Sequence, residues 1–212
     1  DVVAELAPTE RAAAFRLTYP EKEMSYLVVD AYSGGHVEVL PDRNMIAGYS
    51  TANHGGVAGN FRNWFVVISD TQFETRTTDG HIAMVGFKTA KGQKVNLRVA
   101  SSFISHEQAE INLKELGDRT LDEIAQAGRA RWNEVLGRIA VEDGNLDNLR
   151  TFYSCFYRSV LFPRDLSEIN ADGERVHYSP YDGAVHKGYL FADTGFWDTF
   201  RCLFPLLNLV YP

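Results

Sequence analysis

The stretch TTDGHIAMVGFKTAKGQKVNLRVASSFISHEQAEINLKEL, residues 77–116, changes its pattern at Ser105. Before Ser105 it reads as two strands joined by a turn near AKGQK, and after it the apolar residues have helical spacing. Ser105 and Gln108 also have the spacing of a capping box, which marks a helix start. The stretch therefore predicts a β-rich part before this point and a helical part after it.

The first 105 residues hold further short strands with no helical segment between them. MSYLVVDAY and HVEVL are β-branched or aromatic runs closed by SGG and PD, and NWFVVIS follows the glycine-rich NHGGVAG. This succession predicts an antiparallel sandwich or large sheet over residues 1–105. The glycine pair at 34–35 and the HGGVAG stretch at 54–59 lack phosphate-loop spacing, so we interpret both as loops between strands.

The second half of the chain predicts helices. Thr120 and Glu123 form another capping-box pattern, and apolar residues recur behind it in steps of three and four. LDNLRTFYSCFYRSVLFP is a further helix, ended by Pro163. Its aromatic residues crowd a broad face that one partner helix cannot cover. We therefore expect the helical part to be incomplete in this chain.

Composition and charge exclude several classes of protein. The net charge of -7 argues against nucleic-acid binding, which needs a basic face. No run of about 18 apolar residues is present, so we expect no membrane span. The six histidines and two cysteines show no HxxxH or CxxC spacing, which disfavours a zinc site built from this chain.

A long connection, residues 164–192, separates the last two predicted helices. At about 29 residues it exceeds the usual length, and such loops are commonly functional or mobile. Its His177 and His186 are the histidines best placed for substrate contact. We interpret most of the carboxylates in this part of the chain as a solvated acidic loop.

The closing stretch FADTGFWDTFRCLFPLLNLVYP, residues 191–212, places a carboxylate beside aromatic residues. A carboxylate in apolar surroundings needs a partner. Asp198 could form a salt bridge with Arg201, a structural role, or accept hydrogen bonds from a ligand's hydroxyls. Trp197 next to Asp198 is also a combination that holds sugars, because the ring offers an apolar plane and the carboxylate accepts from two hydroxyls.

This closing stretch resembles the Trp-Asp-Thr motif of glycoside hydrolase family 92, the exo-acting α-mannosidases. Three other segments are similar to family motifs in the same order. VEVLPDRNMIAGYS resembles a valine-rich strand followed by an Ile-x-Gly-Tyr-Ser turn, and RWNEVLGRIAVEDGN resembles the Trp-Asn helix before the catalytic domain. TFYSCFYRSVLFPRDLSEINADGERV resembles the first barrel helix and its following loop. The resemblance covers essentially the whole chain.

The resemblance implies a fold and an incomplete enzyme. It implies a multidomain β + α chain, with an antiparallel β-sandwich over 1–105, a helical linker over 106–143 and the opening helices of an (α/α)6 barrel over 144–212. We expect the sandwich to lack its first strands. We also expect the isolated segment to be inactive, because the rest of the catalytic domain would be its necessary partner.

The resemblance also implies a reaction. It implies calcium-dependent removal of terminal α-linked mannose, α-1,2-linked by expectation, from glycans with inversion. The catalytic acid, the base and the calcium ligands are expected downstream of this chain, so no catalytic or metal residue is assigned here. Trp197 and Asp198 match the motif residues that bind the terminal mannose, with Arg201 and His186 as supporting candidates. The family implies a periplasmic or extracellular location.

Two alternatives remain open at this point. The first is a non-catalytic carbohydrate-binding module made of the sandwich alone, although the strongest motif lies in the helical part. The second is a different (α/α)6 glycosidase or phosphorylase with a similar sandwich. A phosphorylase needs an anion site, and no basic cluster is evident in the sequence.

Overall fold

Antiparallel strands make up the first half of the chain in the computed structural model, which describes residues 1–53 and 57–212. Part of the glycine-rich stretch, residues 54–56, therefore lies outside the described residues. The strands of this half are β1 (Val3–Pro8), β2 (Ala12–Tyr19), β3 (Lys22–Asp30), β4 (His36–Leu40), β5 (Met45–Ser50), β6 (Asn63–Ser69), β7 (Thr75–Asp79), β8 (Ile82–Thr89) and β9 (Gln93–Ser102). A 3-10 turn, η1 (Pro41–Arg43), joins β4 to β5.

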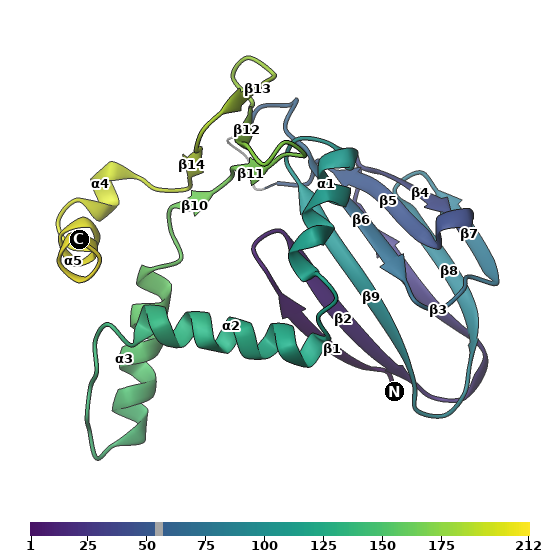
Figure 1. Cartoon of the computed structure of the whole chain (residues 1–212), viewed down its shortest axis with the longest axis horizontal. Coiled ribbons are helices and arrows are strands. Elements are labelled where there is room, and N and C mark those ends of the chain that lie inside the picture. Colours follow the sequence, from purple (N-terminus) through teal and green to yellow (C-terminus); the bar gives the residue numbers. More distant parts are fainter. Residues whose placement is uncertain (54–56) are drawn as a thin grey trace.

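The strands form two sheets that pack face to face (Figure 1). One sheet has the order β1-β2-β9-β6-β5-β4 and the other has the order β3-β8-β7. In the larger sheet, β2 pairs with β9 so that Leu17 lies opposite Val95. Both side chains point into the core between the sheets, together with Ile46, Val85 and Phe87. The predicted antiparallel sandwich is confirmed.

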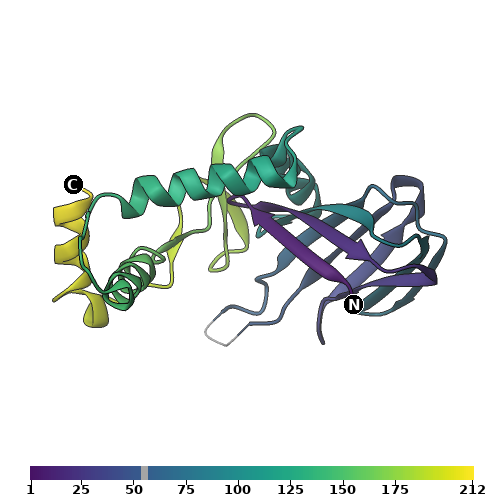
Figure 2. The same ribbon diagram turned by 90° about the horizontal axis from the view of Figure 1, so that it is seen from below.

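Helices cover the other face of the larger sheet at one end (Figure 2). The helices of the chain are α1 (His106–Asn112), η2 (Leu113–Leu116), α2 (Leu121–Leu136), α3 (Leu146–Ser159), α4 (Phe196–Thr199) and α5 (Leu203–Val210). A second core forms where Ala109, Leu116 and Ile124 pack on Met45 and Val66 of the sheet. From there α2 runs away from β1 and β2 towards α3 (Figure 1).

The two predicted capping boxes both lie at helix starts, but only the one at α2 has both of its hydrogen bonds. At α2, Thr120 accepts from the Glu123 backbone N–H and Glu123 caps the Thr120 backbone in return, which is a full capping box. At α1, Ser105 accepts from the Gln108 backbone N–H. The Gln108 side chain does not return to the cap, because it donates instead to Asn112 and to the Ile169 carbonyl.

The predicted turn at residues 46–50 is wrong, because these residues lie in β5. Ala47 pairs with Val66 of β6, and Val37 of β4 lies opposite Gly48 on the other side. A Cβ at Gly48 would lie 2.2 Å from the His36 carbonyl oxygen and 2.9 Å from the Phe65 ring. The glycine therefore permits close packing in a central strand rather than a chain reversal.

The connection 164–192 is not the irregular loop that its composition predicts. It contains β10 (Arg164–Asp165), β11 (Glu168–Ile169), β12 (Arg175–Ser179), β13 (Ala184–Lys187) and β14 (Phe191–Ala192). β11, β12 and β13 form a small antiparallel sheet, and β10 pairs with β14. Asn170 starts one hairpin turn by accepting from the backbone N–H groups of Asp172 and Glu174. Strands this short carry too few residues to show an alternating pattern.

The helices of the second half leave apolar surface uncovered in this chain. Phe156 of α3 is buried against Tyr211, whose hydroxyl donates to the Val135 carbonyl at 2.8 Å. No residue of α5 is buried, and Leu209 is 80% exposed. Over residues 1–53 and 57–212, no helix has the length and apolar character needed to cross a membrane.

Candidate functional site

Trp197 and Asp198 stand side by side on α4, which lies away from the sandwich (Figure 1). Trp197 is 85% exposed and Asp198 is exposed as well. Thr199 donates from its hydroxyl to the Gly195 carbonyl at 2.7 Å and closes the turn. A Cβ at Gly195 would lie 3.3 Å from Asp198 Oδ2, so the glycine leaves room beside the carboxylate. The turn thus carries an exposed apolar ring next to an exposed carboxylate with two acceptor oxygens.

Arg201 does not pair with Asp198 in the structure. Its guanidinium lies over the Phe200 ring, 5.0 Å from the ring centroid. No ion pair between Arg201 and Asp198 is present in the described part of the chain. Of the two interpretations left open by the sequence, the salt bridge is therefore not formed in the structure, and the ligand role stays a prediction.

His186 lies on the hairpin β12–β13, apart from α4 (Figure 1). Its Nε2 atom is 2.7 Å from Asp182 Oδ2, and its ring is 5.9 Å from that of His177 across the strand pair. The pKa of Asp182 is lowered to about 2, chiefly by the Ala184 backbone N–H and then by hydrogen bonds from His186 and Ser179. The structure thus pairs His186 with Asp182 and does not bring it to Trp197.

Glu168 is a buried residue that sequence reasoning missed. It is 2% exposed, whereas the acidic segment was predicted to be solvated. Its Oε1 accepts from the Phe103 backbone N–H and its Oε2 from the Asn112 side-chain amide, both at 2.7 Å. The two-residue strand β11 gives no sequence signal for this burial. The carboxylate ties the small sheet to the sandwich and to α1.

Arg11, in the turn between β1 and β2, makes a second connection to the same segment. Its guanidinium donates to the backbone carbonyls of Asp165 and Ser167, the latter at 2.6 Å. Its backbone N–H donates to Glu115 at 2.8 Å. A cavity of about 200 Å³ lies here between the sandwich and the small sheet, and Arg11, Ser167 and Arg175 are among its lining residues. Neither Trp197 nor Asp198 lines it.

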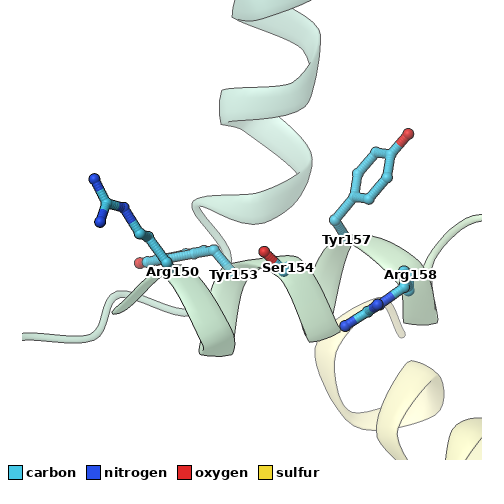
Figure 3. Close-up of a pocket in the computed structure, with 5 residues that line it drawn as sticks. All are labelled: Arg150, Tyr153, Ser154, Tyr157 and Arg158. Carbon is cyan, nitrogen blue, oxygen red and sulfur yellow. The ribbon is translucent and has the colours of Figure 1, made fainter. Parts of the chain in front are cut away.

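A larger hollow of about 470 Å³ lies on α3 (Figure 3). Its lining side chains are Arg150, Tyr153, Ser154, Tyr157 and Arg158, and Figure 3 shows all of them rising from one helix. One helix cannot enclose a ligand, so this hollow is an open helix face. Neither Trp197 nor Asp198 is among its lining residues.

Calcium ligands are not assembled by the described residues. Within residues 1–53 and 57–212, no group of three or more His, Cys, Asp or Glu side chains could hold a metal ion. Calcium binds through hard oxygen ligands, among which are the carboxylates of Asp and Glu. These residues do not fit a calcium site, and we derive no step through the metal.

Both halves of the chain match one known family. Residues 1–114 match the glycosyl hydrolase family 92 N-terminal domain, and residues 108–212 match the glycosyl hydrolase family 92 catalytic domain. The chain belongs to glycosyl hydrolase family 92. The catalytic-domain match disfavours a sandwich-only binding module, and family 92 membership disfavours another (α/α)6 enzyme.

Solved family 92 structures share this fold. The chain is 41% identical to the family GH92 inverting mannosidase BT2199 of Bacteroides thetaiotaomicron VPI-5482, with a TM-score of 0.89 over 97% of this chain. It is 26% identical to the GH92 family glycosyl hydrolase CcMan5, with a TM-score of 0.83 over 97% of this chain. In both cases the chain spans 30% of the other protein's length. The β-sandwich followed by opening barrel helices is thus confirmed.

A sequence relative has been described as secreted. An "uncharacterized secreted glycosidase" of Arthroderma benhamiae is 34% identical over 108 residues, which cover 46% of this chain and 14% of the relative.

The expected domain boundaries at 105 and 143 stay predictions. So do the roles of Trp197, Asp198, Arg201 and His186.

Proposed function

We propose that this chain is part of an inverting α-mannosidase that removes terminal α-linked mannose from glycans, with α-1,2 linkage as the preferred substrate. Its 41% identity to an inverting mannosidase over 97% of its length carries the proposal. In this proposal the chain contributes the sandwich, the linker and the first barrel helices. The acid and base come from the remainder of the catalytic domain, so the 212 residues alone are inactive.

Trp197 and Asp198 bind the terminal mannose in this proposal. The exposed indole of Trp197 stacks on the C–H face of the sugar ring, and the adjacent carboxylate accepts from two hydroxyls. Both groups are exposed on α4 and Asp198 has no ion pair with Arg201, which supports the assignment. Neither residue takes part in bond cleavage. The secreted relative supports an extracytoplasmic location.

The full-length protein tests the reaction. Hydrolysis of α-1,2-, α-1,3- and α-1,6-linked mannobiose is followed by ¹H NMR, which distinguishes the anomers of the released sugar. Inversion predicts β-mannose as the first product, because water attacks the face opposite the leaving group. Retention of configuration, or no release of mannose from any of the three, would contradict the proposal.

Substitutions test the binding residues. Trp197→Ala and Asp198→Asn are each expected to lower kcat/KM by about tenfold to a hundredfold, through lost interactions with the sugar. Tyr181→Ala is the matched control, because Tyr181 is 94% exposed on the hairpin and is not assigned to the site. Wild-type activity in Asp198→Asn would show that this carboxylate does not bind the substrate.

A further inference from the structure

The strand pair β10–β14 joins the two ends of the segment that contains the small sheet, and α4 follows this segment. Arg164 lies opposite Ala192, and Asp165 lies opposite Phe191. The Leu166 backbone N–H adds a hydrogen bond to the Leu190 carbonyl at 2.8 Å. The chain leaves β14 at Ala192 and enters α4 at Phe196, so the strand pair lies shortly before α4.

Asp193 is the first residue after β14 and has an uncommon backbone conformation. Its φ is 68°, in the left-handed region that glycine adopts readily, asparagine and aspartate adopt occasionally, and most other residues rarely adopt. Its Oδ2 atom is 2.5 Å from both Nε and Nη2 of Arg164, the first residue of β10. The ion pair therefore joins the two strands where the chain turns towards α4.

The start of α4 has no side-chain cap. Gly195 precedes the helix and supplies no side-chain capping bond. Asp193, Thr194 and Gly195 connect β14 to α4, so the backbone conformation of Asp193 contributes to the direction in which α4 leaves β14. That direction also determines where Trp197 and Asp198 point, because both lie in the single turn of α4.

Strand β10 is itself held by the sandwich. The guanidinium of Arg11 donates to the backbone carbonyls of Asp165 and Ser167. Ser167 in turn donates from its backbone N–H to Asp165 Oδ1 at 2.8 Å. A continuous series of contacts thus runs from the sandwich through β10 to Asp193 and α4.

We propose that Arg164 and Asp193 are positioning residues that orient the turn carrying Trp197 and Asp198. Asp193 holds a left-handed conformation that the Arg164 ion pair selects, and this conformation directs α4 away from β14. Exposed ion pairs contribute little to global stability, so the pair acts mainly on local geometry. The expected effect on mannose binding rests on the proposed function, whereas the orientation of Trp197 does not.

Variants of the full-length protein separate charge, backbone conformation and hydrogen bonding. Asp193→Ala and Arg164→Gln remove the ion pair, and alanine is also disfavoured at φ 68°. Asp193→Gly permits this φ but lacks an acceptor oxygen. Asp193→Asn tolerates the left-handed region and keeps an oxygen that Arg164 can bind. It is the conservative variant expected to restore wild-type behaviour.

Two measurements are made on each variant. The first is the ¹⁹F NMR resonance of 5-fluorotryptophan at position 197, identified by its loss in Trp197→Phe. The second is the KM and kcat for a mannobiose. Asp193→Ala and Arg164→Gln are expected to shift or broaden the resonance and to raise KM about tenfold, with kcat within about twofold. Asp193→Gly is expected to be intermediate, and Asp193→Asn close to wild type.

The control is Arg150→Gln, which breaks another exposed arginine–aspartate pair. In this pair, Nη1 of Arg150 lies 2.9 Å from Oδ1 of Asp147 on α3. This variant should leave the resonance and KM unchanged. The proposal is overturned if Asp193→Ala and Arg164→Gln keep the ¹⁹F resonance and the KM of the wild type. It is also overturned if these variants lower only the melting temperature. If Asp193→Ala does not fold, the measurements on Asp193→Gly and Arg164→Gln test the positioning role instead. If the wild-type protein releases no mannose, the proposed function fails, while the ¹⁹F comparison still tests the positioning role.

Discussion

Glu168 accepts a 2.7 Å hydrogen bond from the side-chain amide of Asn112, and the two residues are 2% and 5% exposed. Asn112 ends α1, and Glu168 begins the small sheet that leads to α4. Asn112 also donates to the Ser101 carbonyl at 2.8 Å, at the end of β9. This pair therefore fixes the connection 164–192 on the sandwich.

Replacement of Glu168 should destabilise the fold. In Glu168→Gln, one of the donors from Phe103 and Asn112 would face an NH₂ group, which is itself a donor. A buried donor left without an acceptor costs about 1–3 kcal/mol. Urea unfolding of the full-length protein measures the loss, with Asp172→Asn in the exposed turn as control. Equal unfolding free energies for the two variants would contradict the role assigned to Glu168.

The complete capping box at α2 predicts a smaller effect. Thr120→Ala removes the hydroxyl that accepts from the Glu123 backbone N–H, and a lost cap costs about 1 kcal/mol. Thr120→Ser retains the hydroxyl and should remain close to wild type. Thermal unfolding of both variants provides the measurement, and a melting temperature for Thr120→Ala equal to that of Thr120→Ser would argue against the cap.

The hairpin β12–β13 should show an acid-dependent contribution from Asp182. Its pKa is lowered from 3.8 to about 2 in the folded protein. A lowered folded-state pKa means that the carboxylate stabilises the fold above pH 3.8 and that this stabilisation is lost as the pH falls towards 2. A ¹³C NMR titration of the side-chain carboxyl group measures the value directly.

His186→Ala should raise the pKa of Asp182 without returning it to 3.8, because the Ala184 backbone N–H, the largest cause, remains. A pKa of Asp182 that does not respond to His186→Ala would show that the contact between Nε2 and Oδ2 does not form in solution. Lys187→Gln is a suitable control on the same strand, since Lys187 pairs with Glu174 rather than with Asp182.

Metal removal tests the calcium requirement that the family resemblance implies for the full-length enzyme. Treatment with a chelator is expected to abolish mannose release, and added calcium should restore it where magnesium does not, since the two ions differ in preferred geometry. Full activity in excess chelator would refute the requirement.

The parts that the sequence predicts well are those that depend on neighbouring residues. The change from strands to helices at Ser105 and the capping box at Thr120 are local patterns with periods of two and of three to four residues. Trp197 and Asp198 are adjacent in the chain and share one helical turn, so their juxtaposition could be predicted. The order of the family motifs along the chain is likewise a property of the sequence alone, and it indicated the family.

Tertiary structure decided whatever depends on distant partners. Asn112 and Glu168 are 56 positions apart, so only the packed fold shows that this carboxylate is buried and satisfied. Arg164 contacts Asp193, 29 positions later, because β10 and β14 pair. Gly48 is needed in its strand because the Phe65 ring packs where a side chain would otherwise lie. Caps and periodicity arise from the chain's own neighbours, whereas burial and ion pairs require segments that only folding brings together.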